Sequence, residues 1–248
     1  MIQRQSVPSR HIPVPGTFNL RDVGGYPTHE GLDVRWGALY RSDGLHNLGS
    51  AGLDAVARLG IGTVIDLRRD VEISRAPNPC ASDPRFQYHN IPLRIGASGP
   101  AEHPRDLTAL YLAYLEHGTA SVRAVMSTIA AAPADQPVLV HCTAGKDRTG
   151  LIVALALGGA GVVPEAILDD YLLTGTLIAP LLPSIRAAAA REGQDPGALE
   201  PMLACERAFM QTALSYVDVR YGSPEAYLIA AGVTERELHQ LRRRLLGA

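Results

Sequence analysis

This chain of 248 residues contains only three cysteines, one tryptophan and one lysine. Three cysteines are too few for the disulfide framework of a small secreted domain. No apolar run reaches the roughly 18 residues of a membrane-spanning helix, and the N-terminus lacks the apolar core of a signal peptide. We therefore expect a cytoplasmic protein without an integral membrane segment.

Neither sign of charge dominates the chain. The net charge is −2 and the isoelectric point is near 6.4, so the composition carries no footprint of nucleic-acid binding. With 46% hydrophobic residues and no internal repeat, the chain has ample material for one core. We expect the proline-bearing residues 1–16 to form an extended N-terminal arm and residues 17–248 to form a single domain. The oligomeric state stays open.

Residues 141–150, with the sequence HCTAGKDRTG, stand between two apolar segments. The run 138–140 before them is typical of a buried strand, and the run 151–157 after them is too apolar on every side for a surface helix. Strand, tight loop and buried helix form the arrangement in which backbone N–H groups and a helix N-terminus converge on an anion. The pattern therefore predicts an anion-binding loop.

Cys142 and Arg148 stand at the two ends of this loop. The positive end of the helix and the loop N–H groups favour the thiolate of Cys142 over the thiol. A thiolate can attack phosphorus and form a phosphocysteine, which divides one hard hydrolysis into two easier steps without a metal ion. The planar fork of Arg148 fits two phosphoryl oxygens, and the loop N–H groups fit the oxygens that gain charge in the transition state.

The loop resembles a known signature. Its cysteine, arginine and following threonine are similar to the Cys-x5-Arg-Ser/Thr motif of protein tyrosine and dual-specificity phosphatases. The internal Lys146-Asp147 pair resembles the bacterial atypical group of these phosphatases, which has mycobacterial members. Similar segments elsewhere are FNLRDVGG at 18–25, YRS at 40–42, VIDLR at 64–68 and YGS at 221–223.

This resemblance implies the cysteine-phosphatase fold, an α/β domain with a central, mainly parallel sheet of about four or five strands flanked by helices. The C-terminal half is expected to be helical, with helices over 176–191 and 199–217. The implied substrates are phosphotyrosine, phosphoserine and phosphothreonine proteins or phosphoinositides. No cofactor is implied. Because some relatives leave the cell without a classical signal peptide, export by that route stays open.

The chemistry and the resemblance together select the site residues. The catalytic candidates are Cys142, Arg148 and Asp147. His141 is expected to hold the cysteine through a hydrogen bond from its ring to the backbone, and the Thr149 hydroxyl to hydrogen-bond the sulfur. The candidates for binding the substrate phosphate are Thr143, Ala144, Gly145, Lys146, Asp147, Arg148 and Thr149.

The leaving oxygen needs a proton from a general acid. Many tyrosine phosphatases take it from a Trp-Pro-Asp loop, which is absent here because the only tryptophan, Trp36, does not precede a proline. Asp147 is the first candidate, and the equivalent aspartate of the atypical group has been given that role. Its alternative role is an orienting contact to Arg148 or to a neighbouring backbone N–H. The reserves are Asp106 and Asp66, the latter at the end of an apolar strand that would deliver it to the active edge of a parallel sheet.

Lys146 is the only lysine among 23 lysine and arginine residues. An arginine-biased composition explains the arginines but does not explain why the exception lies in the loop. We expect its compact ammonium to contact the substrate phosphate or a second phosphate. Two segments are candidates for covering the site. Residues 94–105 are either a lid or a connector, and the apolar residues within 174–200 form either a lid or part of the core.

Two other functions compete with the phosphatase hypothesis. A non-catalytic phosphate-binding module would use the loop only to hold a phosphorylated partner, but pure binding needs no nucleophile such as Cys142. Thiol redox chemistry or arsenate reduction would need a resolving cysteine close to Cys142. The other two cysteines, Cys80 and Cys205, are far from it in sequence.

Overall fold

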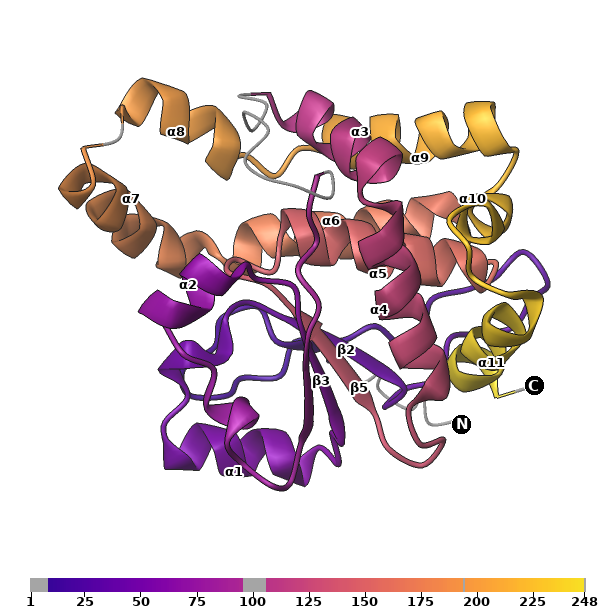
Figure 1. The fold of residues 1–248 in the computed structure, drawn as a ribbon, viewed down its shortest axis with the longest axis horizontal. Coiled ribbons are helices and arrows are strands. Elements are labelled where there is room, and N and C mark those ends of the chain that lie inside the picture. Colours follow the sequence, from indigo (N-terminus) through magenta and orange to yellow (C-terminus); the bar gives the residue numbers. More distant parts are fainter. Residues whose placement is uncertain (1–8, 96–105, 194, 248) are drawn as a thin grey trace, which may run out of the picture.

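The computed structural model describes residues 9–95, 106–193 and 195–247. At its centre lies a five-stranded sheet with the strand order β1-β2-β5-β3-β4, seen below the middle of Figure 1. All neighbouring strands run parallel except β1, which pairs antiparallel with β2, so the predicted mainly parallel sheet is confirmed. The strands are β1 (Arg21–Asp22), β2 (Leu39–Ser42), β3 (Thr63–Asp66), β4 (Gln87–Asn90) and β5 (Val138–His141).

Helices cover both faces of the sheet (Figure 1). The α-helices of the described residues are α1 (Ser50–Arg58), α2 (Asp70–Arg75), α3 (Leu107–His117), α4 (Thr119–Ala131), α5 (Asp147–Gly159), α6 (Pro164–Leu177), α7 (Leu182–Arg191), α8 (Pro196–Leu203), α9 (Arg207–Tyr221), α10 (Pro224–Ala230) and α11 (Glu235–Leu246). Short 3-10 turns are η1 (Leu45–Asn47), η2 (Pro79–Ala81) and η3 (Ala179–Leu181). The predicted helical C-terminal half is confirmed.

The alternation of side chains along the central strands divides the core in two. Val64 and Leu139 point to a smaller cluster with α1, whereas Ile65 and Val140 point to the larger cluster with the helices of the opposite face. Successive side chains of a strand point to opposite faces of a sheet, so strands buried on both faces must be apolar throughout. The helix α5 lies against β5 in the larger cluster and is buried along nearly its whole length, as its sequence predicts.

Two predicted helices are broken in the structure. The helix expected over 176–191 is interrupted at Ile178 and η3, because Pro180 and Pro183 lack the backbone N–H that a continuous helix needs. The helix expected over 199–217 is divided into α8 and α9, since Ala204 adopts an extended backbone with ψ 144°. This second break directs carbonyl groups at the end of α8 toward the predicted site.

The segments predicted at the ends and in the loops are described in part. Residues 9–16 of the expected N-terminal arm lie along β1, where Ile12 N donates to Leu20 O and Asp22 N donates to Arg10 O, both at 3.0 Å. The first eight residues lie outside the described part of the chain. Most of the predicted lid or connector, residues 96–105, also lies outside it.

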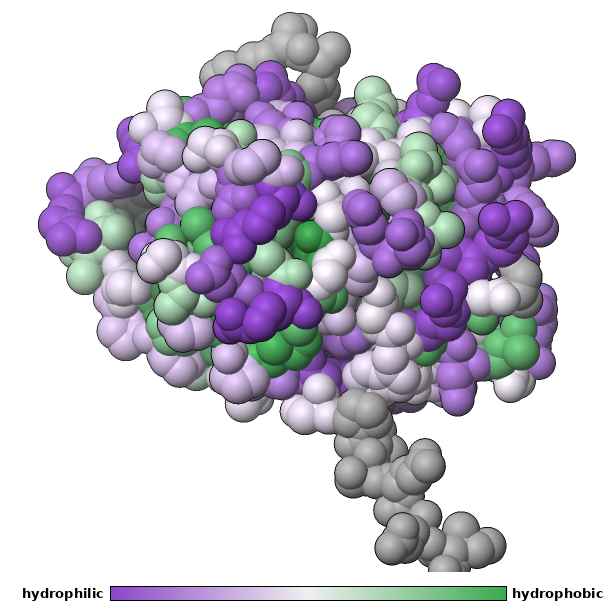
Figure 2. Space-filling view, turned by 90° about the horizontal axis from the view of Figure 1, so that it is seen from below, coloured by the Kyte–Doolittle hydropathy of each residue, from purple (hydrophilic) through white to green (hydrophobic). Residues whose placement is uncertain are grey.

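One helical stretch of the described residues, Pro164–Arg191, is long and apolar enough to cross a membrane by length and composition. It has 28 residues and a mean hydropathy of 1.4 in its most apolar window. Its longest part without a charged residue, between Asp170 and Arg186, stays below the roughly 18 apolar residues of a membrane-spanning helix. The stretch comprises α6, η3 and α7, and α6 packs against α5 and α9 and carries the buried Asp170, so α6 is part of the globular fold. The face seen in Figure 2 is mainly polar with small, separate apolar patches.

Candidate active site

The predicted site lies at the carboxyl ends of three neighbouring parallel strands. Ser42 of β2 and Asp66 of β3 both stand in register with His141, the last residue of β5. Cys142 follows immediately, is 3% exposed, and opens a loop that ends where α5 begins at Asp147. In open α/β sheets ligands bind at this edge, outside the carboxyl ends of the strands. The predicted order of strand, loop and buried helix is confirmed.

The carbonyl groups of the loop point into the protein. Asn19 Nδ2 donates to the oxygens of Ala144 and Gly145, both at 3.1 Å, and Arg41 Nη2 donates to the Gly145 oxygen at 2.6 Å. Across a planar trans peptide, a carbonyl and the N–H of the next residue point in opposite directions. These contacts therefore turn the N–H groups of Gly145 and Lys146 outward, which is the orientation that an anion-binding loop needs.

Gly145 is required by the close approach of the loop to β2. Its φ is +66°, in the left-handed region, and a Cβ added there would lie 2.4 Å from the carbonyl oxygen of Ser42. The loop is also held from the other side, because Gly44 N donates to Thr143 O at 2.9 Å. A side chain at position 145 would force the loop away from the residues that turn its carbonyls inward.

Arg41 is fixed by a buried carboxylate. Asp170 of α6 accepts from Arg41 Nη1 at 2.5 Å and from Arg21 Nε at 3.0 Å, and none of the three residues is more than 1% exposed. Burial alone would raise the pKa of Asp170, but the two arginines outweigh it and lower that pKa to about 2. The carboxylate thus remains ionised and ties α6, through Arg41, to the back of the loop.

His141 holds the cysteine backbone, as predicted. Its ring is fully buried, with Nδ1 at 3.1 Å from the Cys142 oxygen and Nε2 at 2.8 Å from Asn78 Nδ2. Since a carbonyl only accepts, Nδ1 carries the proton and Nε2 accepts from Asn78. Burial lowers the pKa of His141 to about 4 despite the opposing charge of Asp66, so the ring is neutral near pH 7.

The two reserve acids have structural contacts instead. Asp66 is fully buried and accepts from Arg68 Nη2 at 2.7 Å and from Tyr88 Oη at 3.0 Å. Burial alone would raise its pKa, but His141 and Arg68 together lower that pKa to about 2, which is unsuitable for a proton donor. Asp106 caps the N-terminus of α3 by accepting from Ala109 N at 2.8 Å.

Arg148 is bound end-on by a carboxylate that the sequence did not indicate. Glu72 of α2 accepts from Nη1 and from Nη2 of Arg148, each at 2.7 Å, and also from Thr143 Oγ1 at 2.5 Å. Burial alone would raise the pKa of Glu72, but the hydrogen bonds and charge of Arg148 lower it well below its usual range. The pKa of Arg148 is correspondingly raised by Glu72 against the effect of burial.

The remaining edge of the guanidinium is the one that suits a phosphate. Nη1 also donates to Leu67 O at 3.3 Å, and Nη2 donates to Thr143 Oγ1 at a long 3.2 Å. Within the described part of the chain, no hydrogen bond from Arg148 Nε is found. A phosphoryl group that replaces the weak contact to Thr143 would meet Nε and Nη2 side by side, while Glu72 keeps the opposite edge.

Lys146 is buried rather than presented to solvent. Its side chain is 2% exposed, and Nζ donates to the carbonyls of Met202 at 2.8 Å and Ala204 at 2.5 Å and pairs with Asp147 Oδ1 at 3.2 Å. The two carbonyls accept hydrogen bonds from the ammonium, and the carboxylate of Asp147 pairs with its charge. Contact with a substrate, as predicted from the sequence, would require this buried side chain to be uncovered.

Asp147 and Thr149 complete the set of predicted residues. The Asp147 side chain is 23% exposed, and its Oδ1 accepts from Tyr111 Oη of α3 at 2.8 Å. The alternative contact from Asp147 to Arg148 is not found. The Thr149 hydroxyl is fully buried and has no hydrogen-bond partner among the described residues, so the expected bond to the sulfur is not formed.

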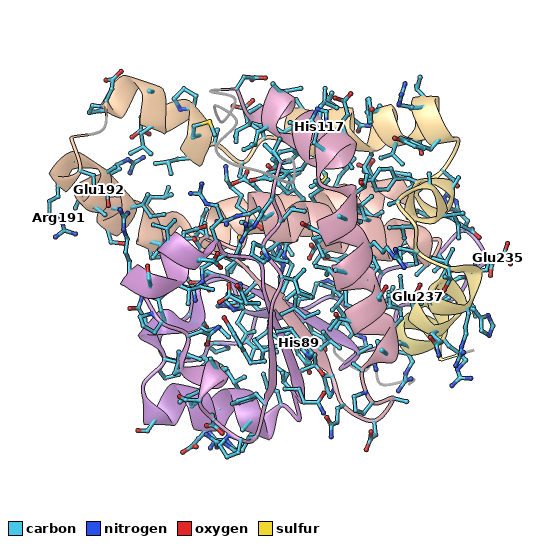
Figure 3. The ribbon with its side chains drawn as sticks, viewed as in Figure 1. His89, His117, Arg191, Glu192, Glu235 and Glu237 are labelled. Atoms are coloured by element: carbon cyan, nitrogen blue, oxygen red, sulfur yellow. The ribbon has the colours of Figure 1, made fainter. Side chains whose placement is uncertain are left out.

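The helices α7 and α8 form an arm over this region, within the predicted 174–200 segment. Arg186 and Glu200 join the two helices at 2.7 Å, and Arg75 of α2 pairs with Glu192 at the end of α7 at 3.3 Å. Figure 3 labels Glu192 at this end of the arm. At its other end the arm is held by Lys146. The arm therefore contacts both the loop and α2, and its role as a lid stays a prediction.

The sequence profile of the tyrosine phosphatase family matches residues 12–247. The chain belongs to this family. A tyrosine-protein phosphatase of Nostoc commune is 35% identical over 219 residues, which cover 84% of this chain and 74% of that protein. The triple specificity protein phosphatase PtpB of Mycobacterium tuberculosis is 28% identical over 275 residues, which cover 94% and 98%.

A solved structure also matches. The crystal structure of Pseudomonas aeruginosa TpbA in complex with pTyr is 17% identical, with a TM-score of 0.46, and the match covers 93% of this chain and 99% of that one. The family membership confirms the predicted resemblance and the assignment of the chain as a tyrosine-phosphatase-type enzyme. The five-stranded sheet flanked by helices is the predicted cysteine-phosphatase fold.

Proposed function

We propose that this chain hydrolyses phosphomonoesters through a phosphocysteine intermediate on Cys142. One observation supports this most. Cys142 and Arg148 lie at the two ends of a single loop whose carbonyls are turned inward by Asn19 and Arg41. A single loop thereby carries a nucleophile, outward N–H groups and a guanidinium, the groups that displacement at phosphorus requires.

The reaction proceeds in two steps. In the first, Sγ of the Cys142 thiolate bonds to phosphorus while the P–O bond to the leaving group breaks, and the carboxyl group of Asp147 gives its proton to the departing oxygen. In the second, water attacks phosphorus, Asp147 takes the proton of that water, and the P–S bond breaks to return the thiolate and inorganic phosphate. Arg148 and the loop N–H groups bind the phosphoryl oxygens in both steps.

Phosphoproteins are the substrates that we propose first. Relatives in the family are named as tyrosine-protein and triple specificity protein phosphatases, which favours phosphotyrosine together with phosphoserine and phosphothreonine. Phosphoinositides are the second class. The hypothesis that Lys146 binds a second phosphate of such a lipid is less well supported, because its ammonium already donates to two carbonyls and pairs with Asp147.

Hydrolysis of para-nitrophenyl phosphate in the presence of a chelator tests the mechanism. We expect chelator-resistant turnover that falls by at least about a thousandfold in Cys142→Ser. Cys205→Ser is the matched control, since Cys205 is the partly exposed cysteine whose Sγ contacts a carbonyl, that of Tyr171, at 3.5 Å. Rapid quenching of wild type should trap phosphate on Cys142.

Two outcomes would overturn the proposal. Activity that disappears in chelator or persists in Cys142→Ser would exclude the thiolate mechanism. Binding of phosphotyrosine peptides without turnover would favour the phosphate-binding module. A panel of phosphotyrosine, phosphoserine and phosphothreonine peptides and phosphoinositides then identifies the substrate class, and Lys146→Met shows whether the ammonium discriminates among them.

A further inference from the structure

Among the described residues, the carboxylate of Asp147 accepts a hydrogen bond at one of its two oxygens. Oδ1 accepts from Tyr111 Oη at 2.8 Å and lies 3.2 Å from Lys146 Nζ. In the ranges that the structure covers, no hydrogen bond to Oδ2 is found. The hydroxyl of Tyr111 and the nearby charge of Lys146 make Oδ1 the oxygen that accepts, so a proton on this carboxyl group belongs on Oδ2.

Tyr111 is itself fixed by a second tyrosine. Its side chain is fully buried, and its hydroxyl lies 3.0 Å from that of Tyr171 on α6, with the two rings packed edge to face at 6.3 Å. Because Tyr111 gives its only hydroxyl proton to Asp147, Tyr171 must donate to Tyr111. Burial, followed by the nearby charge of Asp147 for Tyr111, raises the pKa of both hydroxyls, so both stay protonated donors near neutral pH.

We propose that Tyr111 is the positioning residue for the general acid, and that its hydrogen bond keeps the transferable proton of Asp147 on Oδ2. The inference rests on the proposed function, in which Asp147 gives that proton to the leaving oxygen. Tyr111 touches neither the phosphoryl group nor the leaving group in this scheme and acts only through Asp147.

The groups around Asp147 determine how the loss of the hydrogen bond from Tyr111 should change the pH dependence of kcat. Besides Tyr111, the ionisable groups that face it come from α3, α6, the loop and the turn between α8 and α9: Tyr114, Tyr171, Lys146 and Cys205. With Tyr111 replaced by phenylalanine, Lys146 is left as the group that pairs with Oδ1 among these groups. The ionised carboxylate then loses a hydrogen bond that stabilises it, while the lysine charge stays in place.

The test compares Tyr111→Phe with Tyr227→Phe. Tyr227 is also fully buried and also gives one hydrogen bond, to Leu115 O at 3.0 Å, but it lies on α10 and has no contact with Asp147. Phenyl phosphate has a poor leaving group that needs the acid, whereas para-nitrophenyl phosphate does not. We expect Tyr111→Phe to lower kcat for phenyl phosphate about tenfold and to leave KM unchanged. We expect kcat for para-nitrophenyl phosphate to change by less than about twofold.

The pH profile gives a second measurement. The descending alkaline limb of kcat should shift to higher pH in Tyr111→Phe and stay in place in Tyr227→Phe. In an Asp147→Asn background, where kcat for phenyl phosphate should already be lower by about a hundredfold, adding Tyr111→Phe should cause no further loss.

The remaining outcomes would overturn either the positioning role of Tyr111 or the assignment of Asp147 as the general acid. Equal losses on both substrates in Tyr111→Phe, or a profile equal to wild type, would overturn the positioning role while leaving the proposed function intact. If Asp147→Asn keeps the wild-type difference between the two substrates, Asp147 is not the acid, and the inference fails with it.

Discussion

Replacing Glu72 tests how the protein presents Arg148. Glu72 accepts two hydrogen bonds of 2.7 Å from the guanidinium. Hydrogen bonds to charged groups contribute about 1.5–3 kcal/mol each. Because the two side chains are 15% and 20% exposed, solvent screening lowers the value, and we take about 2 kcal/mol for the pair. If this energy holds Arg148 in the conformation that binds phosphate, its loss lowers the rate by about 30-fold.

We therefore expect Glu72→Ala to lower kcat/KM for para-nitrophenyl phosphate about 30-fold. Most of the loss should appear as a higher KM and weaker inhibition by inorganic phosphate, since an unrestrained guanidinium must be ordered when the phosphate binds. Glu72→Gln should be no better, because its amide N–H groups would face the N–H groups of Arg148.

Asp70→Asn is the matched control for this experiment. Asp70 lies on the same short helix and pairs at 3.0 Å with the exposed Arg94, away from Arg148. Its variant should keep wild-type kinetics. An increase in activity in Glu72→Ala would refute the reasoning, since it would mean that the carboxylate competes with phosphate for the guanidinium rather than orienting it.

Three further predictions concern stability and the loop. The pKa of buried His141 is lowered from 6.5 to about 4. Between these two pH values the unfolded chain therefore binds a proton at His141 that the folded chain does not bind. The free energy of unfolding in urea should then be largest above pH 6.5 and fall by up to about 3 kcal/mol toward pH 4; an unchanged pH dependence in His141→Asn would contradict this. Asp66→Asn should lower the free energy of unfolding by about 3–5 kcal/mol, because it leaves the charge of Arg68 buried without a partner, and a variant as stable as wild type would rule this out. Lys146→Met should speed limited proteolysis at the turn after α8, since the carbonyls of Met202 and Ala204 lose their donor; equal cleavage rates by mass spectrometry would show that other contacts hold the turn.

The sequence was most informative where chemistry and local order coincide. The spacing of Cys142 and Arg148 between an apolar run and an apolar helix predicted a strand, a loop and a buried helix, and the structure has all three. The bond from His141 to the cysteine backbone was predicted as well, because both residues are adjacent in the chain. Local spacing determines such contacts.

Contacts between distant segments were not predicted. Glu72 lies 76 residues before Arg148, and nothing in a linear pattern pairs them. Two facts together could have indicated the pair. A buried guanidinium needs a counter-charge, and α2, which carries Glu72, follows β3, the strand beside β5. The burial of Lys146 depends on the extended backbone at Ala204, where the periodicity of the sequence alone predicts a helix.

The environment of Lys146 also has a practical consequence. It is the only lysine of the chain, its side chain is 2% exposed, and its ammonium donates to the carbonyls of Met202 and Ala204 at the end of α8. Acylating reagents that need an unprotonated, accessible amine should therefore leave every side chain of the folded protein almost unlabelled. Labelling at this one position would report, without any introduced probe, each time the arm of α7 and α8 detaches from the loop.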